Sequence, residues 1–332
     1  MKPIRVVQYG MGPIGAQCVR QMIQRAGLEI VGAVDIDPAK VGRDVGEVAE
    51  AGRALGCAVV SDAGALFAAA APDVVIHTTS SSLKAVEGQL AGIVEAGLNV
   101  ITTCEEAAFP ALKHPDLART LDDLARRHNV TILGTGINPG FAMDAIAIAL
   151  SAPCRGVERV KVHRVVDAGV RRLPLQRKVG AGVTLDEFEE RKAAGTIKHV
   201  GQPESVAMIA YALGWKLDEI EETLEPVVAG EEMKTEYLTI PAGHVAGIHQ
   251  VAVGRRGRET PIQLVLDMYV GAPKPGEHIV LEGVDQIETH IKGIHGDTAT
   301  AAVVINAIPR VLQAPAGFLT MADLPLVHYW EA

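Results

Sequence analysis

Two adjacent carboxylates, Glu105 and Glu106, follow the apolar run 99–103 and stand between Cys104 and Ala107. Ionised carboxylates at the end of a buried strand are costly unless a positive group lies beside them. A cationic substrate such as an amine would satisfy this pair, and one carboxylate could take a proton from its nitrogen. Carboxylates also favour the first turn of a helix, so a structural role for the pair is open as well.

A glycine pattern near the N-terminus has the spacing of a dinucleotide-binding turn. It follows an apolar strand and opens a helix, in the order G-M-G-P-I-G. The first glycine permits a tight turn, the second admits a pyrophosphate, and the third lets helix and strand pack closely. Free N–H groups at the start of the helix would hold the phosphates. We therefore predict cofactor contacts at Gly10, Gly12, Pro13, Ile14 and Gly15.

An acidic residue at the end of the second strand bears on the choice of cofactor. Asp35 stands 20 positions after Gly15, where its carboxylate can accept hydrogen bonds from both ribose hydroxyls of an adenosine. A carboxylate repels a 2′-phosphate, so the sequence favours NAD. Lys40 and Arg43 are interpreted as solvated loop charges, but either can turn toward a phosphate, which leaves NADP open.

Polar residues follow three later strands, at the sheet edge where ligands of open parallel sheets bind. The hydroxyl-rich run after the fourth strand is expected to line the path of the cofactor, although a simple helix-capping loop has the same composition. Thr103 and Cys104 follow the fifth strand, and a nucleophilic role for this cysteine lacks a histidine partner. The predicted cofactor contacts here are Thr78, Thr79, Ser80, Thr103 and Cys104.

The sixth strand runs into an irregular turn over residues 134–141 that is rich in glycine and contains a proline. Asn138 in this turn is predicted to meet the edge of a nicotinamide, and Phe141 to wall the substrate pocket.

Histidines and arginines supply the candidates in the second half of the chain. His199 lies between a glycine turn and a helix start, and His295 precedes a helix start, so we predict both in the substrate pocket. Arg171 and Arg172 are interpreted as solvated loop charges rather than as a carboxylate receptor. No His, Asp or Glu spacing predicts a metal site. The remaining candidates are His163, Lys178 and His249.

The elements that must position these residues change character near residue 150. Before it, apolar strands at 4–10, 28–35, 57–61, 73–79, 99–103 and 130–135 alternate with helical segments at 14–25, 83–96 and 117–128. Strands without polar alternation are typical of a parallel sheet covered on both faces. We therefore predict an α/β fold whose residues 1–150 form a Rossmann domain, a doubly wound parallel sheet that binds the dinucleotide.

After residue 150 the strands alternate polar with apolar residues, as in a sheet with one solvated face. Strands are expected at 157–166, 243–254, 260–271 and 277–283, and helices at 185–194 and 204–213. This pattern predicts a mixed α+β domain for substrate binding and dimerisation over 151–296. A last helix at 297–314, capped by Asp297 or Thr298, is expected to bring the segment 297–332 back onto the Rossmann domain.

Composition excludes several classes of protein. The chain of 332 residues carries a formal net charge of −9 and only 4% aromatic residues, which argues against a nucleic-acid partner. Its apolar runs are far shorter than the roughly 20 residues that span a bilayer. A strand begins almost at the N-terminus, which leaves no room for a signal peptide, and the four cysteines are widely spaced. We expect a cytoplasmic protein with neither a disulfide framework nor a membrane partner.

Four segments together resemble the 2,4-diaminopentanoate dehydrogenase family and its relatives, the native amine dehydrogenases, within the dihydrodipicolinate-reductase-like group. Segments 177–182 (RKVGAG) and 198–205 (KHVGQPES) are similar to second-domain motifs of that family, and the resemblance spans about residues 4–310. The four segments are 10–15, 101–110 (ITTCEEAAFP), 134–144 (GTGINPGFAMD) and 296–309 (GDTATAAVVINAIP).

The resemblance implies an NAD(P)-dependent oxidoreductase acting on CH–NH2 groups, usually a homodimer. Such an enzyme catalyses reversible oxidative deamination of a primary amine or diamino acid, or reductive amination of a carbonyl with ammonia. A glutamate of the CEE motif would be catalytic, and we favour Glu105 over Glu106, although spacing alone does not separate them.

Alternative functions remain open for this sequence. The same frame suits a homoserine or aspartate dehydrogenase, or a dihydrodipicolinate-reductase-like enzyme, although the paired histidine and lysine signature of the reductase is not found. A non-catalytic dinucleotide-binding sensor is the alternative from a different class, but no basic patch for a partner is evident.

Overall fold

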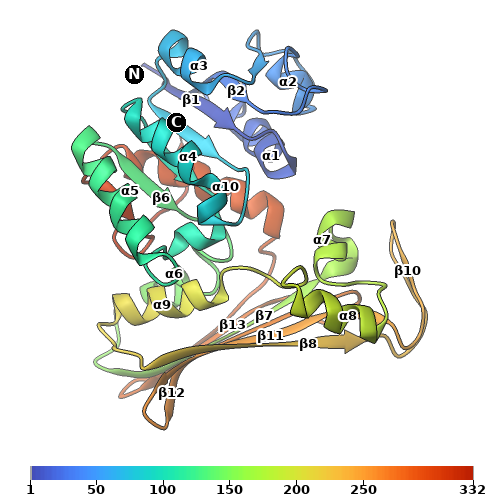
Figure 1. The fold of residues 1–332 in the computed structure, drawn as a ribbon. Coiled ribbons are helices and arrows are strands. Elements are labelled where there is room, and N and C mark those ends of the chain that lie inside the picture. Colours follow the sequence, from blue (N-terminus) through green and yellow to red (C-terminus); the bar gives the residue numbers. More distant parts are fainter. Residues whose placement is uncertain (1, 332) are drawn as a thin grey trace. The chain divides into compact units, whose positions relative to one another are not determined.

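The chain folds as two compact units, seen in a computed structural model that describes residues 2–331 (Figure 1). The first unit combines the residues up to 141 with those from 295 onward, and the second covers 142–294. The first boundary differs from the expected 150/151 because Met143 and Ala147 pack in the core of the second unit, against Val160 and Ile209. The second boundary, 294/295, differs from 296/297 because His295 begins the last helix of the first unit.

The first unit is built on a parallel sheet, as the apolar strands predicted. Among the described residues it has seven strands in the order β15-β6-β5-β4-β1-β2-β3. Val75, Ile101 and Ile132 in its central strands are fully buried, since helices cover both faces. The strands are β1 (Ile4–Tyr9), β2 (Leu28–Val34), β3 (Val59–Val60), β4 (Val74–His77), β5 (Asn99–Thr102), β6 (Thr131–Gly134) and β15 (Gly317–Leu319).

The helices of the first unit connect successive strands. They are α1 (Pro13–Met22), α2 (Val45–Val48), α3 (Ala63–Ala70), α4 (Leu83–Glu95), the 3-10 helix η1 (Glu105–Ala108), α5 (Pro115–His128) and α10 (Gly296–Val311). Helix α10 packs on α1, and β15 pairs with β6, so the C-terminal segment lies in the same unit as the N-terminal sheet. The N-cap of α10 is His295, not Asp297 or Thr298, because the helix begins one residue earlier than expected.

The second unit contains a mixed sheet with the order β14-β13-β7-β12-β11-β8. Only the β7–β12 pair of this sheet is parallel within the described chain. The main strands are β7 (Val157–Asp167), β8 (Glu219–Val228), β11 (Val245–Arg256), β12 (Glu259–Tyr269), β13 (Gly276–Gly283) and β14 (Ile287–Ile291). Two short strands, β9 (Met233–Lys234) and β10 (Thr239–Ile240), form a separate hairpin.

The helices of this unit lie on one face of the sheet (Figure 1). Helix α9 contacts β8, β11 and β12, and α6 contacts β13. The strands alternate accordingly, with every second residue of β11, β12 and β13 buried beneath these helices. The segments are α6 (Ala145–Leu150), the 3-10 helix η2 (Ala168–Val170), α7 (Leu173–Lys178), α8 (Leu185–Ala193) and α9 (Gln202–Ala212).

Two strands of this sheet were not predicted. Strand β8 forms an edge of the sheet and carries Glu219, Glu221 and Glu225 together with Pro226, which depart from ordinary strand composition. Charged residues and proline are tolerated on edge strands because one side of the backbone forms no ladder. Strand β14 forms the opposite edge. Within residues 2–331, no helix is both long enough and apolar enough to cross a bilayer.

The segment bearing the two adjacent carboxylates packs directly onto the sheet at Gly134. A methyl group on Gly134 would lie 2.0 Å from the carbonyl oxygen of Ala107. Ala107 belongs to η1, so the last residue of β6 must lack a side chain for η1 to approach the sheet this closely.

We expect the substitution Gly134→Ala to destabilise the protein by about 1–3 kcal/mol, because η1 must move away from β6 to admit the methyl group. The midpoint of thermal unfolding should fall by several degrees. Gly92→Ala is the matched control, because Gly92 is exposed within α4 and open space surrounds its missing side chain. That control should leave stability unchanged or raise it by up to about 1 kcal/mol. Equal midpoints for Gly134→Ala and wild type would contradict this packing argument.

Candidate active site

The glycine loop between β1 and α1 has the geometry of a dinucleotide-binding turn. Gly10 donates to the Val34 carbonyl at 2.8 Å and has a φ of 93°, a conformation that favours glycine. A methyl group on Gly15 would lie 1.9 Å from the Gly10 carbonyl oxygen, so this position must lack a side chain. Nothing lies within 4 Å of the missing side chain at Gly12. The loop is therefore tight beneath its first and third glycines and open at its second.

The N-terminus of α1 is suited to hold an anion. Its N-cap, Gly12, has no side chain to cap the helix, and the first turn contains no acidic residue. Pro13 begins the helix without an N–H group of its own, and Ile14 follows it. The remaining free N–H groups and the positive end of the helix dipole fit a pyrophosphate at this point.

Asp35 is held against the glycine loop. Its carboxylate accepts hydrogen bonds from the Met11 amide at 2.7 Å and the Asp37 amide at 2.9 Å. Lys40 is not a solvated charge as expected, because its ammonium group donates to Asp35 at 3.2 Å and pairs with Asp37 at 3.5 Å. Partial burial opposes ionisation of Asp35, but these hydrogen bonds outweigh it and lower its pKa. Arg43 is exposed.

The residues after β4 lie beside the glycine loop and also stabilise it by hydrogen bonds. The Thr78 hydroxyl donates to the Gly10 carbonyl at 2.9 Å and accepts from the Gln8 amide at 2.9 Å. The Thr79 hydroxyl donates to the Gln89 side chain at 2.8 Å. The Ser80 hydroxyl accepts a hydrogen bond from the Ser82 amide. Their predicted contacts with a cofactor stay predictions, but Thr78 has a clear second role in fixing the loop.

His77, at the end of β4, is a buried neutral link between strands and helix. Its Nδ1 lies 2.9 Å from the Thr102 hydroxyl and its Nε2 lies 2.7 Å from the Gln89 side chain. Burial lowers the pKa of His77 to about 4, although the Gln89 hydrogen bond acts in the opposite direction. The ring is therefore uncharged at neutral pH and acts as a spacer between β4, β5 and α4.

The two carboxylates of η1 have different surroundings. The Glu106 carboxylate accepts a hydrogen bond from the Leu83 amide at 2.8 Å, which caps the N-terminus of α4. It also lies 3.1 Å from His114 Nε2 and 3.9 Å from Lys113 Nζ. Partial burial opposes ionisation of Glu106, but the Leu83, His114 and Lys113 interactions prevail and lower its pKa. The cap is made by Glu106 and not by Glu105, so the structure separates two residues that spacing left equivalent.

The neighbours of Glu105 on the N-terminal side are structural. Burial raises the pKa of the Cys104 thiol to about 12, so a thiolate nucleophile is disfavoured there. The Cys104 amide donates to the Thr102 hydroxyl at 3.1 Å, and the Thr103 amide donates to the His77 carbonyl at 3.0 Å. These bonds fix the backbone immediately before Glu105.

Asn138 is a predicted cofactor contact, and its side-chain amide makes no hydrogen bond to any of the described residues. The side chain is only 7% exposed, and neither its Nδ2 nor its Oδ1 has a hydrogen-bond partner within residues 2–331. Buried amides are rarely left unsatisfied, so a ligand offering one donor and one acceptor fits this position. The carboxamide of a nicotinamide is such a group. Phe141, at the end of the same turn, is half-buried.

In the second unit, His199 lies among cations. Gln250 clamps its backbone by accepting from the His199 amide at 2.9 Å and donating to its carbonyl at 2.8 Å. Burial, followed by the charges of Lys178, Arg164 and Arg171, lowers the pKa of His199 to about 3. The ring is neutral at physiological pH, and its Nδ1 has no hydrogen-bond partner in the described chain.

Other second-half candidates differ from expectation. The interpretation of Arg171 as a solvated charge is wrong, because the residue is only 6% exposed, and Arg172 is half-buried. His163 and His249 both bond Asp267, each at 2.6 Å, on the sheet face opposite to the buried Gln250. Side chains alternate along a strand, so these two histidines do not join His199. His295 is an exposed N-cap in the first unit, and its place in a pocket stays a prediction.

Sequence reasoning missed several buried polar residues at the start of α9. Gln202, Glu204 and Ser205 are fully buried, and the Gln202 amide has no hydrogen-bond partner among the described residues. The Ser205 hydroxyl donates to Asp144, which is also fully buried, at 2.6 Å. The available signal is the segment 198–205 (KHVGQPES), in which these polar residues stand at the start of a helix.

A seven-stranded parallel sheet with a tight glycine turn and an acidic residue after β2 defines, among the described residues, a nucleotide-binding unit of the Rossmann class. The sequence comparisons agree: residues 10–134 match the family model for the NAD-binding domain of homoserine dehydrogenase. Residues 141–332 match the model for the 2,4-diaminopentanoate dehydrogenase C-terminal domain. The chain is an oxidoreductase with a nicotinamide dinucleotide site.

Full-length relatives make the assignment specific. The chain is 31% identical to the 2,4-diaminopentanoate dehydrogenase of Acetoanaerobium sticklandii, over 98% of this chain and 94% of the relative. It is 24% identical to an amine dehydrogenase of Streptomyces virginiae, over 97% and 96% of the two chains. An amine dehydrogenase structure from Mycobacterium smegmatis matches with a TM-score of 0.87 at 25% identity, covering 99% and 98%. The protein belongs to the 2,4-diaminopentanoate dehydrogenase family, which confirms the resemblance.

We expect Glu106→Gln to lower stability by about 1 kcal/mol at pH 7, because the charge that caps α4 and pairs with His114 is lost. The folded-state pKa of Glu106 is lowered, so its stabilisation is complete above the unfolded value of about 4.3 and is lost as the pH falls through the folded value. The difference in thermal midpoint between wild type and variant should therefore shrink in acid.

Glu87→Gln is the matched control for this comparison, because Glu87 is exposed in the middle of the same helix. Its effect should stay within about 0.5 kcal/mol. Equal stability of wild type and Glu106→Gln at pH 7 would show that the cap contributes nothing.

Proposed function

We propose that this protein is an NAD-dependent amine dehydrogenase that interconverts a primary amine with the corresponding carbonyl compound and ammonia. Membership of the 2,4-diaminopentanoate dehydrogenase family supports the reaction class. The observation that carries the choice of catalytic residue is the position of Glu105 directly after β5, at the carboxyl edge of the sheet, while the next carboxylate, Glu106, caps α4.

Glu105 follows β5 at the carboxyl edge of the parallel sheet, the same edge at which the glycine loop and the 134–141 turn end. Glu105 is half-buried, and its backbone is fixed on one side by the Cys104 and Thr103 hydrogen bonds and on the other by the packing of Ala107 on Gly134. A carboxylate held this way can be oriented toward a ligand nitrogen with little loss of side-chain freedom.

Different residues of the first unit would hold the different chemical groups of the nicotinamide dinucleotide. The α1 N-terminus and Gly12 would hold the pyrophosphate, Asp35 the adenosine ribose, and Asn138 the carboxamide. When bound, the nicotinamide supplies a hydride acceptor for amine oxidation and a hydride donor for the reverse direction.

Glu105 would accept and return the proton of the substrate nitrogen. An ammonium group cannot release hydride from its neighbouring carbon, because its nitrogen has no lone pair. The Glu105 carboxylate accepts a proton from the substrate ammonium and then stabilises the positive iminium formed when hydride leaves. Water adds to the iminium carbon and ammonia departs. In the reductive direction the same carboxylate holds ammonium beside the carbonyl and returns the proton.

Preference for NAD over NADP is proposed from Asp35. Its carboxylate, already ionised and oriented by the Met11 amide, would accept from the ribose hydroxyls and repel a 2′-phosphate. Lys40 offsets part of that charge, so the preference is expected to be marked but not absolute.

A diamino acid is the favoured substrate class over a simple amine. The second unit buries Arg164 and Arg171 and places Lys178 near the neutral His199, while Glu277 pairs with Arg164 at 3.2 Å. Several cationic side chains gathered in one place suit an anionic group. A carboxylate on the substrate would supply it.

A cytoplasmic homodimer is the proposed state of the protein. The described cysteines are free, which suits a reducing compartment. The sheet of the second unit has helices on one face only, and its other face mixes valines with paired histidines and acids. A second copy stacked on this face by a two-fold axis would bury it. We expect light scattering after size-exclusion chromatography to give twice the chain mass, and a monomeric mass would contradict this arrangement.

We expect Glu105→Gln to lower kcat for amine oxidation by about 10²–10⁴-fold, because the group that accepts the substrate proton is lost. The dissociation constant for NADH, measured by fluorescence titration, should remain within a factor of about three. Turnover is followed by absorbance with NAD and NADP against diamino acids and amines of matched chain length, and in reverse with carbonyl compounds with and without ammonium.

Glu106→Gln is the matched control, since it removes the neighbouring charge while leaving Glu105 in place. It should keep most of the kcat at a temperature well below its unfolding midpoint. Normal kcat in Glu105→Gln would overturn the assigned role. Carbonyl reduction that needs no ammonium would point instead to an alcohol-type dehydrogenase, and tight NADH binding without any turnover would favour a sensor.

A further inference from the structure

Three metal-binding side chains meet on the outer hairpin of the second unit. His278 on β13 pairs directly with His290 on β14, and Glu288 lies two residues before His290. Side chains on a strand alternate between faces, so Glu288 and His290 share the face that carries His278. We call these three residues the hairpin cluster.

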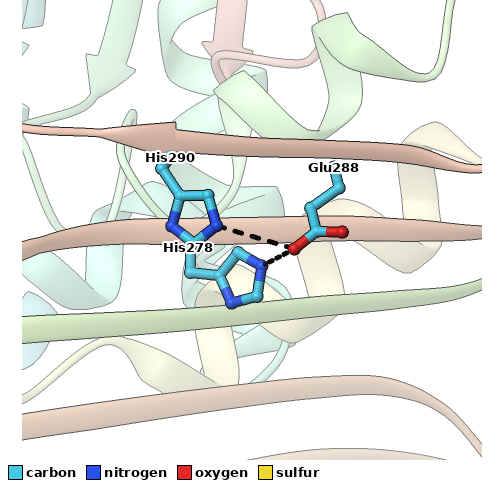
Figure 2. A group of neighbouring side chains, drawn as sticks. All are labelled: His278, Glu288 and His290. Atoms are coloured by element: carbon cyan, nitrogen blue, oxygen red, sulfur yellow. Dashed lines mark hydrogen bonds and ion pairs between the residues drawn. The ribbon is translucent and has the colours of Figure 1, made fainter.

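The atoms of the hairpin cluster converge on one point. His278 Nε2 lies 2.8 Å and His290 Nε2 lies 3.5 Å from the same oxygen of Glu288 (Figure 2). The two imidazole rings are stacked, with centroids 4.1 Å apart and planes 6° apart. The candidate ligand atoms all lie within 4.8 Å of one another. A tetrahedral ion with bonds of about 2.0–2.2 Å separates its ligands by about 3.3–3.6 Å, so the distances fit, and the stacked rings must rotate for both Nε2 atoms to point at one ion.

The donor set selects the kind of ion. Two imidazole nitrogens and one carboxylate oxygen suit Zn²⁺ and its neighbours Co²⁺, Ni²⁺ and Cu²⁺, whereas Mg²⁺ and Ca²⁺ prefer oxygen ligands. Three protein ligands leave at least one position for water. The side chains of His278, Glu288 and His290 are 37%, 49% and 64% exposed, respectively, so an ion can reach them.

The residues of β7 nearest to the hairpin cluster already have partners of their own. The next residue across the sheet is His163 on β7, and its Nε2 is already bonded to Asp267 at 2.6 Å. Lys161, two residues earlier on β7, pairs with Glu282 at 2.6 Å.

We propose that His278, Glu288 and His290 form a binding site for a divalent transition-metal ion, with Zn²⁺ as its natural class of ligand. The ion would clasp β13 to the edge strand β14 and so stabilise the hairpin. The site does not depend on the proposed amine chemistry, because no residue of the glycine loop or of η1 takes part in it. His278 is paired with His163, so the hairpin cluster lies at the β13–β14 edge of the open sheet face, and two copies stacked on that face would have to leave this edge uncovered for an ion to enter.

The test uses the full-length, tag-free protein after treatment with a chelator. Zn²⁺ is titrated calorimetrically and Co²⁺ by its visible absorption, which reports a nitrogen-containing site of low coordination number. We expect one ion per chain and a raised midpoint of thermal unfolding with Zn²⁺. His278→Gln, His290→Gln and Glu288→Gln should each weaken binding by at least about tenfold. Binding should also weaken in acid, because protons compete with the ion for its ligands.

His128→Gln is the control, because His128 is exposed on α5 and lies outside the hairpin cluster. It should bind Zn²⁺ as wild type does. Circular dichroism of each cluster variant without metal should match wild type, which separates loss of ligands from loss of folding. The proposal is overturned if the stripped wild type takes up no stoichiometric ion, or if the cluster variants bind as tightly as wild type.

Discussion

The placement of η1 depends on one close approach, the Ala107 carbonyl against the bare α-carbon of Gly134. That contact lets a short 3-10 helix sit directly on the end of the parallel sheet. From there Glu106 reaches the N-terminus of α4 and pairs with His114, so one residue ties together η1, α4 and the start of α5. Glu105, its neighbour in the chain, begins the same short helix.

The glycine loop is likewise held in place by its neighbours. Thr78 bonds the Gly10 carbonyl, Gln8 bonds Thr78, and Met11 bonds Asp35, so the loop is fixed by its neighbours before any ligand arrives. His77 stays uncharged in the middle of this network. Pre-formed hydrogen bonds of this kind reduce the ordering that binding would otherwise require. Asn138 is the contrast, because within residues 2–331 its buried amide has no hydrogen-bond partner.

The local sequence pattern predicts most of the fold, but it does not predict most of the side-chain contacts between residues that are distant in the chain. The apolar strands, the glycine turn and Asp35 follow from short-range rules, and the structure bears out the resulting architecture. The role of Glu106 depends on a helix start 23 residues away, and the burial of Arg171 depends on packing within the second unit, so neither can be inferred from neighbours in the chain. The hairpin cluster depends on strand register, and β14 had not been recognised as a strand.

The acidic edge strand β8 has a consequence for how molecules of this protein can meet. Glu219, Glu221, Glu225 and Pro226 line the outermost strand on that side of the mixed sheet. Repulsion between like charges, and a missing amide at the proline, oppose the addition of another strand there. Growth of the sheet into an open-ended polymer is thereby blocked on that side, while contact through the broad, valine-bearing face remains open. Association into fibres through the β8 edge is therefore disfavoured.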